Sequence, residues 1–333
     1  MIIARDFKAF PSPRFSRTVL TMGVFDGVHL GHREVLSRVR LAARKIGGTA
    51  AVLTFQEHPQ NVLKPHASKF LLTSFTHKLT LLEAEGMDLC LVPHFNVRFS
   101  KMSPEAFVEK ILVRKLKIRK LILGDDSRFG HRRQGDVSRM ADLAARFGFD
   151  FEAVPARKEK MFTVKSTLIR ELLAEGELEA ARKFLGRPYS VAARIVRGEG
   201  RGRELGFPTA NLDLENEILP PMGVYAVRAR LIDSRILPER PGFFVMKHAH
   251  LPERWPAVLN WGKKPTFRCN IREAVAEVHL LGFRGNVYGK MLEIEFLKML
   301  RRERKFACAE DLKRQIFADI RRAERVFLQK SEV

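Results

Sequence analysis

The sequence predicts a Rossmann-like, doubly wound α/β domain followed by a small antiparallel β-barrel with a C-terminal helix. The chain has 333 residues, which is long for a single hydrophobic core. Up to Gly186, strand patterns and helix patterns alternate in units of about 30 residues, which is typical of a parallel sheet. After Gly186 the strand patterns follow one another, as they do in an antiparallel barrel.

The N-terminal domain is expected to alternate strands with helices. An apolar run that starts at Val19 stops at Asp26-Gly27, where the first strand should end. The later elements are expected to be helices at 33–43, 78–85, 104–112 and 137–147, and strands at 50–55, 89–93 and 120–124. Ser103 and Pro104 are typical of the N-cap and the first position of a helix.

The C-terminal domain is expected to be mostly β-structure. Segments rich in Val, Ile, Tyr and Phe predict strands at 189–198, 224–232, 274–281 and 287–296. Helical periodicity returns over 310–327. Residues 186–188, Gly-Arg-Pro, are the expected joint, which gives domains at 1–186 and 187–333. The segment 237–255, within a proline-containing stretch, is expected to be a loop or an insertion.

Charge is the unusual part of the composition. The chain has 60 Lys and Arg residues against 38 Asp and Glu residues, a net charge of +22. Residues 1–186 carry +12 and residues 187–333 carry +10, so the excess belongs to no tail or single motif. Such a balance is typical of proteins that bind nucleic acid, anionic membranes or phosphorylated ligands. The basic runs at 114–120 and 301–305 are expected on solvated faces.

Cysteine usage and hydropathy favour a cytoplasmic protein without a membrane partner. Cys90, Cys269 and Cys308 have no spacing typical of a disulfide framework or a metal site, which suits a reducing compartment. The first 15 residues lack the apolar core of a signal peptide. No apolar run approaches the ~20 residues that span a bilayer.

The first chemical motif is the string GVFDGVHLGH at residues 23–32, where a strand meets a helix. In an open parallel sheet, ligands bind beyond the carboxyl ends of the strands. Gly31 leaves the backbone open to a phosphate, and the start of the helix attracts anions. His29 and His32 can donate hydrogen bonds to a triphosphate and to the charge that develops as pyrophosphate leaves.

This string resembles the H-x-G-H signature of nucleotidyltransferases, and with G-x-F-D-G-x-H it resembles the adenylyltransferase module of bacterial bifunctional riboflavin kinase/FAD synthetases. Segments 54–59, 94–107, 124–130 and 165–170 are similar to further motifs of that module, with Glu57, Ser127 and Lys165 replacing the family's Pro, Phe and Ser. The resemblance implies catalytic roles for His29 and His32. It implies nucleotide or flavin binding by Gly23, Phe25, Asp26, Gly31, His58, Asn96, Asp126, Arg128, Ser166, Thr167 and Arg170.

The second motif is the string GEGRGRELGFPTAN at residues 198–211. Its four glycines can form a loop whose amides face phosphates. Followed by F-P-T-A-N, the loop resembles that of the riboflavin kinase domain, in which the Thr and Asn bind the magnesium–nucleotide complex. The resemblance implies nucleotide binding by Gly198, Gly202, Gly206 and Pro208, and metal binding by Thr209 and Asn211.

The resemblance to the kinase continues through segments 221–225, 260–267, 277–281, 288–290 and 301–306. It implies that Glu277 is the base that accepts the proton of the riboflavin 5′-hydroxyl. Tyr288, Phe306 and Arg301 are candidates to border the flavin, although aromatic residues on strands are more often part of the core. Strand alternation places Glu277, His279 and Leu281 on one face. For the base role, that face is expected to line the mouth of the barrel.

The resemblance implies a bifunctional enzyme that uses ATP and Mg²⁺ to convert riboflavin to FMN, and ATP again to convert FMN to FAD. Two alternatives stay open. Lys165, Ser127 and Glu57 motivate a riboflavin kinase whose adenylyltransferase is weakened or inactive. The charge alone motivates a basic nucleic-acid-binding protein on a degenerate scaffold, and the motifs do not favour it. The sequence leaves the oligomeric state open.

Overall fold

The computed structural model of the protein divides into two compact units. The described residues are 1–7, 10, 14–63, 70–159, 161–198, 206–214, 217–240, 242–250, 253–263 and 274–330. The first unit, here the N-terminal unit, consists of Met1–Leu71, Phe75–Ser166 and Ser234–Lys247. The second, here the barrel unit, consists of Leu72–Ser74, Thr167–Asp233 and His248–Val333.

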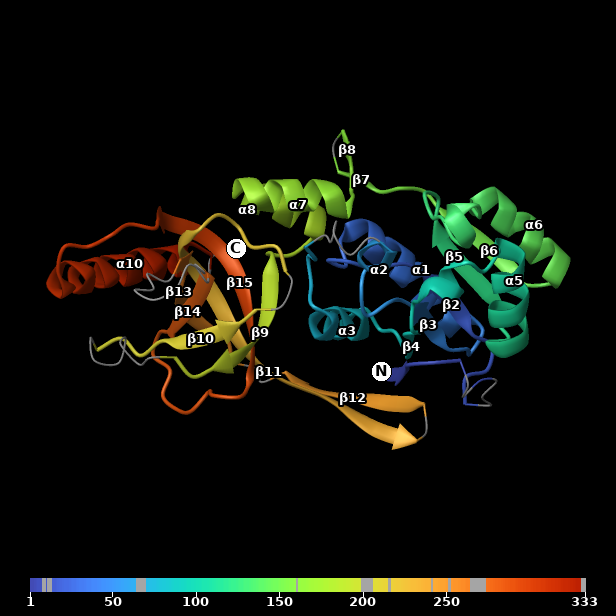
Figure 1. Cartoon of the computed structure of the whole chain (residues 1–333), viewed down its shortest axis with the longest axis horizontal. Helices are drawn as coiled ribbons and strands as arrows, with labels where there is room; N and C mark the ends of the chain where they lie inside the picture. Colours follow the sequence, from blue (N-terminus) through green and yellow to red (C-terminus); the bar gives the residue numbers. More distant parts are fainter. Residues whose placement is uncertain are drawn as a thin grey trace. The chain divides into compact units, whose positions relative to one another are not determined.

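The N-terminal unit contains a parallel sheet covered on both faces (Figure 1). Its strand order is β1 (Ile2–Ala4), β4 (Leu89–Leu91), β3 (Ala50–Leu53), β2 (Val19–Met22), β5 (Lys120–Gly124) and β6 (Asp150–Val154). All neighbouring pairs in this series are parallel. The doubly wound parallel sheet predicted from the alternating pattern is therefore confirmed.

Different helices bury apolar side chains on the two faces of this sheet. On one face, α1 (Leu30–Lys45) and α3 (Phe75–Ala84) contribute Leu36, Val39 and Leu79 to a core with Val52 and Ile122. On the other face, the contributing helices are α5 (Pro104–Phe107), the π-helix Val108–Lys115 that continues it, and α6 (Val137–Phe147). Shorter elements are α2 (Pro59–Leu63), α4 (Val97–Ser100), a 3₁₀ turn at His131–Arg133, β7 (Lys158–Glu159) and β8 (Phe162–Thr163).

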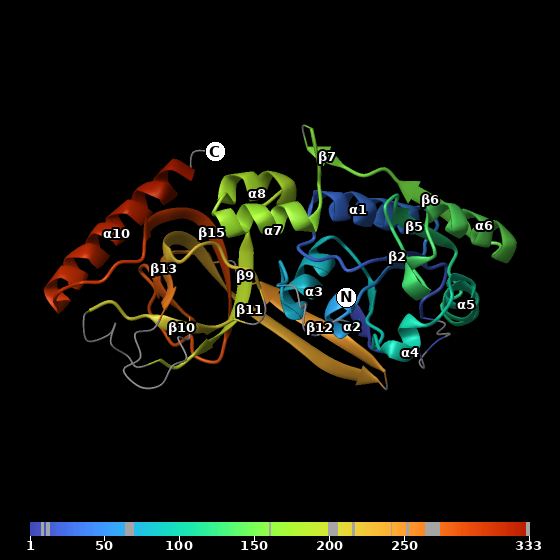
Figure 2. The same ribbon diagram turned by 45° about the horizontal axis from the view of Figure 1, so that its top comes forward.

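The barrel unit is a closed antiparallel barrel (Figures 1 and 2). Its strand order is β13 (Trp255–Lys263), β14 (Ala274–Leu280), β10 (Ala210–Asp213), β9 (Ser190–Val196), β15 (Met291–Arg302) and β11 (Gly223–Arg240), and β11 closes the barrel by pairing with β13. The C-terminal helix α10 (Ala309–Lys330) packs Ala323 and Val326 against Leu297. The predicted barrel with a C-terminal helix is confirmed, and helices α7 (Ser166–Glu175) and α8 (Leu178–Leu185) precede it.

The prediction of a loop at 237–255 was wrong. The segment contains the end of β11, the strand β12 (Phe243–His250) and the start of β13. Residues Phe243 to Val245 pair antiparallel with β1, and the Phe243 side chain is almost fully buried beside Phe10. Prolines at 238, 241, 252 and 256 hide the strand pattern in the sequence.

The strand expected at 287–296 is displaced toward the C-terminus. Tyr288 and Gly289 form a turn, in which Gly289 has φ +75°, and β15 begins only at Met291. Gly and Asn near this turn favour a bend over an extended strand.

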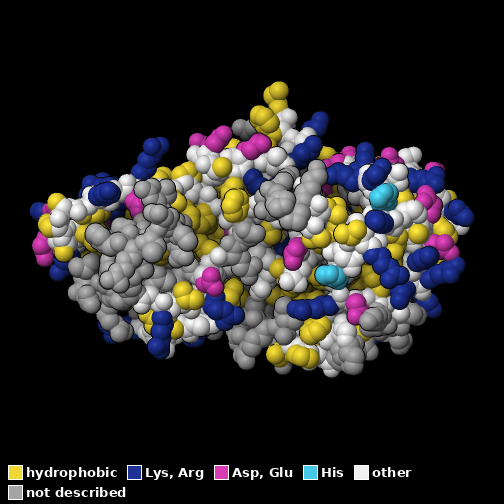
Figure 3. All heavy atoms as spheres, viewed as in Figure 1, with side chains coloured by type: hydrophobic (Ala, Val, Ile, Leu, Met, Phe, Trp, Pro, Cys, Tyr) yellow, Lys and Arg dark blue, Asp and Glu magenta, His cyan; other side chains and the backbone are white. Residues whose placement is uncertain are grey.

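Basic side chains are spread over the surface, as the even division of charge between the chain halves suggests. Figure 3 shows Lys and Arg side chains distributed over the visible face and interspersed with Asp and Glu. Many of the described basic residues form ion pairs, such as Arg38 with Glu152 and Arg139 with Glu105.

Candidate functional sites

The first candidate site is built on the loop between β2 and α1. His29 is the N-cap of α1, and its Nδ1 accepts a hydrogen bond from the backbone N–H of His32 at 3.3 Å. The two imidazole rings stack with their centroids 3.6 Å apart and an interplanar angle of 14°. His29 is buried. The two predicted catalytic histidines therefore form one pair at the positive end of a 16-residue helix.

The loop before this pair has a strained backbone. Phe25 has φ +51° and Val28 has φ +38°, values that residues other than glycine rarely adopt. The Phe25 ring lies 5.0 Å from the His32 ring, and a Cβ on Gly31 would lie 3.3 Å from the His29 ring. The surrounding structure must therefore hold this loop in place.

Three side chains from elsewhere in the N-terminal unit hydrogen-bond to backbone carbonyls of this loop. Thr54 Oγ1 donates to Val24 O at 3.0 Å, and Ser166 Oγ donates to Asp26 O at 3.2 Å. Lys78 Nζ donates to Val24 O at 3.2 Å and to Phe55 O at 2.6 Å. The motifs at 54–59 and 165–170 therefore meet the 23–32 motif directly.

Lys78 is not among the site residues predicted from the sequence. Its side chain is buried, and burial lowers its pKa to about 8, while the negative charge of Asp26 opposes that shift. The only signal in the sequence is a single lysine within the apolar helix pattern of residues 75–84. Such a lysine can also be read as an exposed helix residue.

His58, Asn96, Asp126 and Arg128 follow the parallel strands β3, β4 and β5, so they lie beyond the same edge of the sheet. His58 Nδ1 accepts from Gln60 N–H at the start of α2, and Asn96 caps α4 by accepting from Phe99 N–H at 2.9 Å. Asp126 and Arg128 lie exposed in the turn after β5. Ser166, Thr167 and Arg170 lie in the first two turns of α7.

Aromatic rings from three of these motifs, the segments 54–59, 94–107 and 124–130, form a connected cluster. Neighbouring centroids are 5.2 Å apart for Phe55 and Phe95, 5.8 Å for Phe95 and Phe99, and 6.1 Å for Phe99 and Phe107. Phe107 in turn contacts Phe129 at 6.3 Å. Phe55, Phe95 and Phe99 are half-buried, whereas Phe107 and Phe129 are buried. This cluster is not among the features predicted from the sequence.

The second candidate site is a row of polar side chains across the barrel. Glu277 on β14 is paired with Asn211 on β10 and, on its other side, with Asn260 on β13. Directly paired residues point to the same face of a sheet. The predicted base and a predicted metal ligand are therefore neighbours.

The face of β14 that carries Glu277 is the outer face of the sheet, on the side of α10. Ala276, Val278 and Leu280 fill the core, so Glu277 and His279 point outward by strand alternation. The Phe207 ring lies 6.0 Å from the His279 ring and 4.8 Å from the ring of Phe317 on α10. Helix α10 therefore borders this face.

Gly198, at the start of the glycine-rich motif, lies close to the Asn211 side chain. A Cβ at Gly198 would lie 1.7 Å from Asn211 Nδ2, so a side chain at Gly198 would collide with the predicted ligand. Gly206 has φ +88°, and the Pro208 carbonyl lies 2.8 Å from His279 Nδ1. Thr209 is half-buried and immediately precedes β10. Gly202 lies outside the described residues.

Arg301 anchors α10 to the barrel. Its Nε donates to Asp319 Oδ2 at 2.8 Å, and Asp319 also accepts from Gln315 Nε2 at 2.7 Å. Asp319 is buried on α10, and the Arg301 side chain is only 16% exposed. The expectation that the run 301–305 begins on a solvated face was therefore wrong for Arg301.

Tyr288, another predicted flavin neighbour, is exposed. The Arg197 guanidinium lies 5.9 Å from the centroid of its ring.

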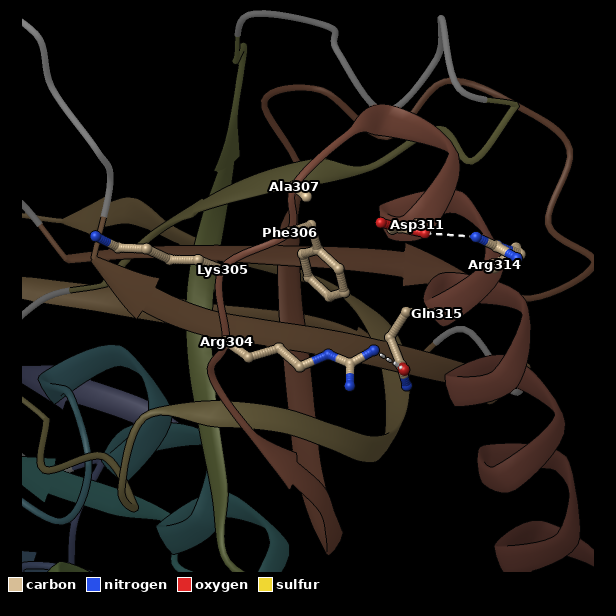
Figure 4. A pocket seen from close by; sticks show the side chains of 7 residues that line it. All are labelled: Arg304, Lys305, Phe306, Ala307, Asp311, Arg314 and Gln315. Atoms are coloured by element: carbon tan, nitrogen blue, oxygen red, sulfur yellow. Dashed lines mark hydrogen bonds and ion pairs between the residues drawn. The ribbon is translucent and has the colours of Figure 1, made fainter.

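A hollow of about 440 Å³ lies where β15 leads into α10 (Figure 4). Its lining residues are Arg304, Lys305, Phe306, Ala307, Asp311, Arg314 and Gln315. The Arg304 guanidinium lies 4.8 Å from the Phe306 ring centroid and hydrogen-bonds Gln315. Arg314 pairs with Asp311 and thereby lowers the pKa of that carboxyl group. The hollow thus combines one aromatic ring with several charged groups.

Two family models match the chain in succession. The model described as FAD synthetase matches residues 12–168, and the model described as riboflavin kinase matches residues 185–327. Proteins described as bifunctional riboflavin kinase/FMN adenylyltransferase are similar over most of both chains. The Haemophilus influenzae protein is 36% identical and covers 92% of this chain and 94% of its own. The Bacillus subtilis protein is 34% identical and covers 94% and 93%.

A solved structure has the same fold over nearly the whole length. It is a crystal structure described as a macrolide-efflux protein from Streptococcus pneumoniae, 26% identical, with a TM-score of 0.79 and coverage of 97% of this chain and 98% of that chain. Within the residues described for the present chain, no helix is both long and apolar enough to cross a membrane.

Proposed function

Because the chain belongs to the family of bifunctional riboflavin kinase/FMN adenylyltransferases, we propose that it phosphorylates riboflavin to FMN and adenylylates FMN to FAD, with ATP as donor in both reactions. One observation supports this most strongly. The chain has two separate polar constellations, the His29–His32 pair and the Asn211–Glu277 pair, and each lies within the segment matched by the corresponding family model. We assign adenylyl transfer to residues 1–186 and the kinase to residues 187–333.

In the kinase reaction, Glu277 accepts the proton of the riboflavin 5′-hydroxyl as its oxygen bonds to the γ-phosphorus of ATP. The bond from that phosphorus to the bridging oxygen breaks, and ADP leaves. Phosphoryl transfer depends mainly on positioning and charge neutralisation, with one carboxylate orienting the nucleophile. The half-exposed position of Glu277 beside Asn211 suits this role.

The residues around Glu277 fit a magnesium ion that keeps several waters. Thr209 and Asn211 offer a hydroxyl and an amide oxygen two residues apart, and Asn211 is paired with the Glu277 carboxylate. Mg²⁺ is usually held by one or two protein groups together with substrate phosphates. A closed cage of three or more His, Cys, Asp or Glu side chains does not occur among the described residues. When bound, the ion neutralises phosphate charge.

The hollow beside α10 is the proposed site of the flavin ring in the kinase. Phe306 offers a ring face, and Arg304 and Gln315 offer polar groups to the edge of a planar ligand. Arg301 keeps α10 against β15 and so maintains the wall of this hollow. Tyr288 stays a predicted flavin contact.

In the adenylyltransferase reaction, a phosphate oxygen of FMN bonds to the α-phosphorus of ATP as the bond to pyrophosphate breaks. His29 and His32, at the start of α1, hydrogen-bond the triphosphate and stabilise the departing charge. Ser166, Thr167 and Arg170 add hydroxyl and guanidinium donors. The half-buried rings of Phe55, Phe95 and Phe99 offer the flavin an aromatic surface.

The decisive experiment is to incubate the purified protein with riboflavin, ATP and Mg²⁺ and to separate the flavins over time. We expect FMN to form first and FAD to follow. Accumulation of FMN without FAD, even when FMN is supplied directly, would support a kinase with an inactive adenylyltransferase, as Lys165 suggests. Absence of both products would contradict the proposal.

A further inference from the structure

A buried lysine connects two loops of the adenylyltransferase site. Lys78 is 5% exposed, and its ammonium donates to Val24 O in the loop after β2 and to Phe55 O in the loop after β3. These loops carry the 23–32 and 54–59 motifs. A lysine is almost never buried without partners, because removing its charge from water is costly.

The loop after β2 needs such support. Phe25 and Val28 have positive φ values, and the loop leads directly to the N-cap His29. Conformations of this kind persist only where neighbouring groups impose them. The Val24 carbonyl accepts from both Thr54 Oγ1 and Lys78 Nζ. An ammonium group with three donors can join two carbonyls from different loops, which the single hydroxyl of Thr54 cannot do.

Two groups near Lys78 partly offset the cost of burying its charge. The negative charge of Asp26, within the same loop, raises the pKa of Lys78 and partly offsets the effect of burial. The ammonium also lies 5.7 Å from the centre of the Phe75 ring.

We propose that Lys78 is a positioning residue for adenylyl transfer: by joining the carbonyls of Val24 and Phe55, it keeps the His29–His32 pair in the geometry that receives the triphosphate. This proposal rests on the adenylyltransferase function proposed above. Lys78 acts through the backbone and does not touch the substrate.

The test compares Lys78→Met, which fills similar space without donors, with Lys78→Arg, which keeps the charge and several donors. Leu82→Ala is the matched control, because Leu82 is fully buried on the same helix and lies outside the site. We expect Lys78→Met to lower kcat for FMN adenylylation at least tenfold, with riboflavin phosphorylation within twofold of wild type. Lys78→Arg should recover part of the loss. Leu82→Ala should lower Tm with less than a threefold effect on kcat.

Hydrogen exchange gives a readout that does not depend on activity. Lys78→Met should speed amide exchange in residues 23–32 more than Leu82→Ala does. The proposal is overturned if exchange there is unchanged, or if Leu82→Ala lowers adenylylation as much as Lys78→Met. If the wild type makes no FAD but Lys78→Met still loosens residues 23–32, the loop support stands and the adenylyltransferase assignment fails.

Discussion

Asn211 and Glu277 are directly paired across β10 and β14. Their side chains therefore share one face of the barrel, and Asn260 extends the row on the far side of Glu277. A carboxylate and two amides placed in this way are held by the strand register, which is more rigid than a loop. Substitutions in this row should affect the kinase reaction, and substitutions in the His29–His32 pair should affect adenylyl transfer.

Replacing Glu277 by Gln should lower kcat for FMN formation by a factor of roughly 10² to 10⁴, the usual contribution of a general base. The amide keeps the shape of the side chain but cannot take the proton. Flavin separation after incubation with riboflavin and ATP measures the loss. Adenylylation of supplied FMN should be unchanged, and an equal loss of both activities would refute the two-site assignment.

Replacing His32 by Ala should have the opposite effect. The backbone N–H of His32 that His29 caps stays in place, so α1 should still begin correctly. The stacked imidazole is lost, and FAD formation from FMN and ATP should fall by about 10² or more, the usual effect of removing a transition-state donor. Pyrophosphate release reports the rate. A normal adenylylation rate would show that His32 only supports the turn.

Replacing Gly198 by Ala should impair the kinase by displacing Asn211. The new methyl group would lie 1.7 Å from Asn211 Nδ2, so the amide must move. We expect a higher KM for ATP in riboflavin phosphorylation. The effect should largely disappear in the Asn211→Ala background, because the clash is then removed. Full additivity of the two substitutions would contradict this explanation.

Replacing Asp319 by Ala should destabilise the barrel unit by about 3 kcal/mol, because it leaves the guanidinium of Arg301 without its buried partner. Chemical denaturation followed by circular dichroism measures the change. The matched control is Asp311→Ala on the same helix, which breaks an ion pair with Arg314 that is open to solvent. The control should leave the transition midpoint nearly unchanged.

Lys78 should make stability depend on pH between about 8 and 10.5. The pKa of Lys78 is about 8 in the folded chain against an ordinary 10.5, so the unfolded chain binds more protons in this range. Stability therefore rises with pH, by about 1 kcal/mol per unit relative to Lys78→Met. Burial raises the pKa of nearby Cys90 to about 12, so its thiol stays neutral in the folded chain. Denaturation of both proteins at several pH values measures the difference, and parallel curves would contradict it.

The fold and the motif residues were largely predictable, because strands, helices and phosphate-binding loops leave local patterns. The string at 23–32 predicted a strand–helix junction, and the structure has it between Met22 and Leu30. The order of strands after Gly186 predicted the barrel. Tertiary placement was not predictable: strand alternation put Glu277 and His279 on one face, but could not say that α10 borders it.

Features that depend on contacts distant in sequence were missed. In the sequence, Lys78 looks like any other helix lysine. Its role becomes visible only from its hydrogen bonds to two carbonyls that lie 54 and 23 residues away. Arg301 belongs to a basic run that was expected to be exposed to solvent. Its side chain is instead largely buried in an ion pair with Asp319. The aromatic cluster joins rings from three separate motifs, and no one motif reveals it.

The pairing of β12 with β1 has a consequence for biosynthesis. The N-terminal sheet places Ile2 to Ala4 between β4 and residues Phe243 to Val245. A ribosome makes the first three-quarters of the chain before that last strand exists, so the edge of β1 stays open throughout this interval. A fragment ending at the Gly186 joint would keep that open edge permanently. Its tendency to self-associate should therefore exceed that of the full chain.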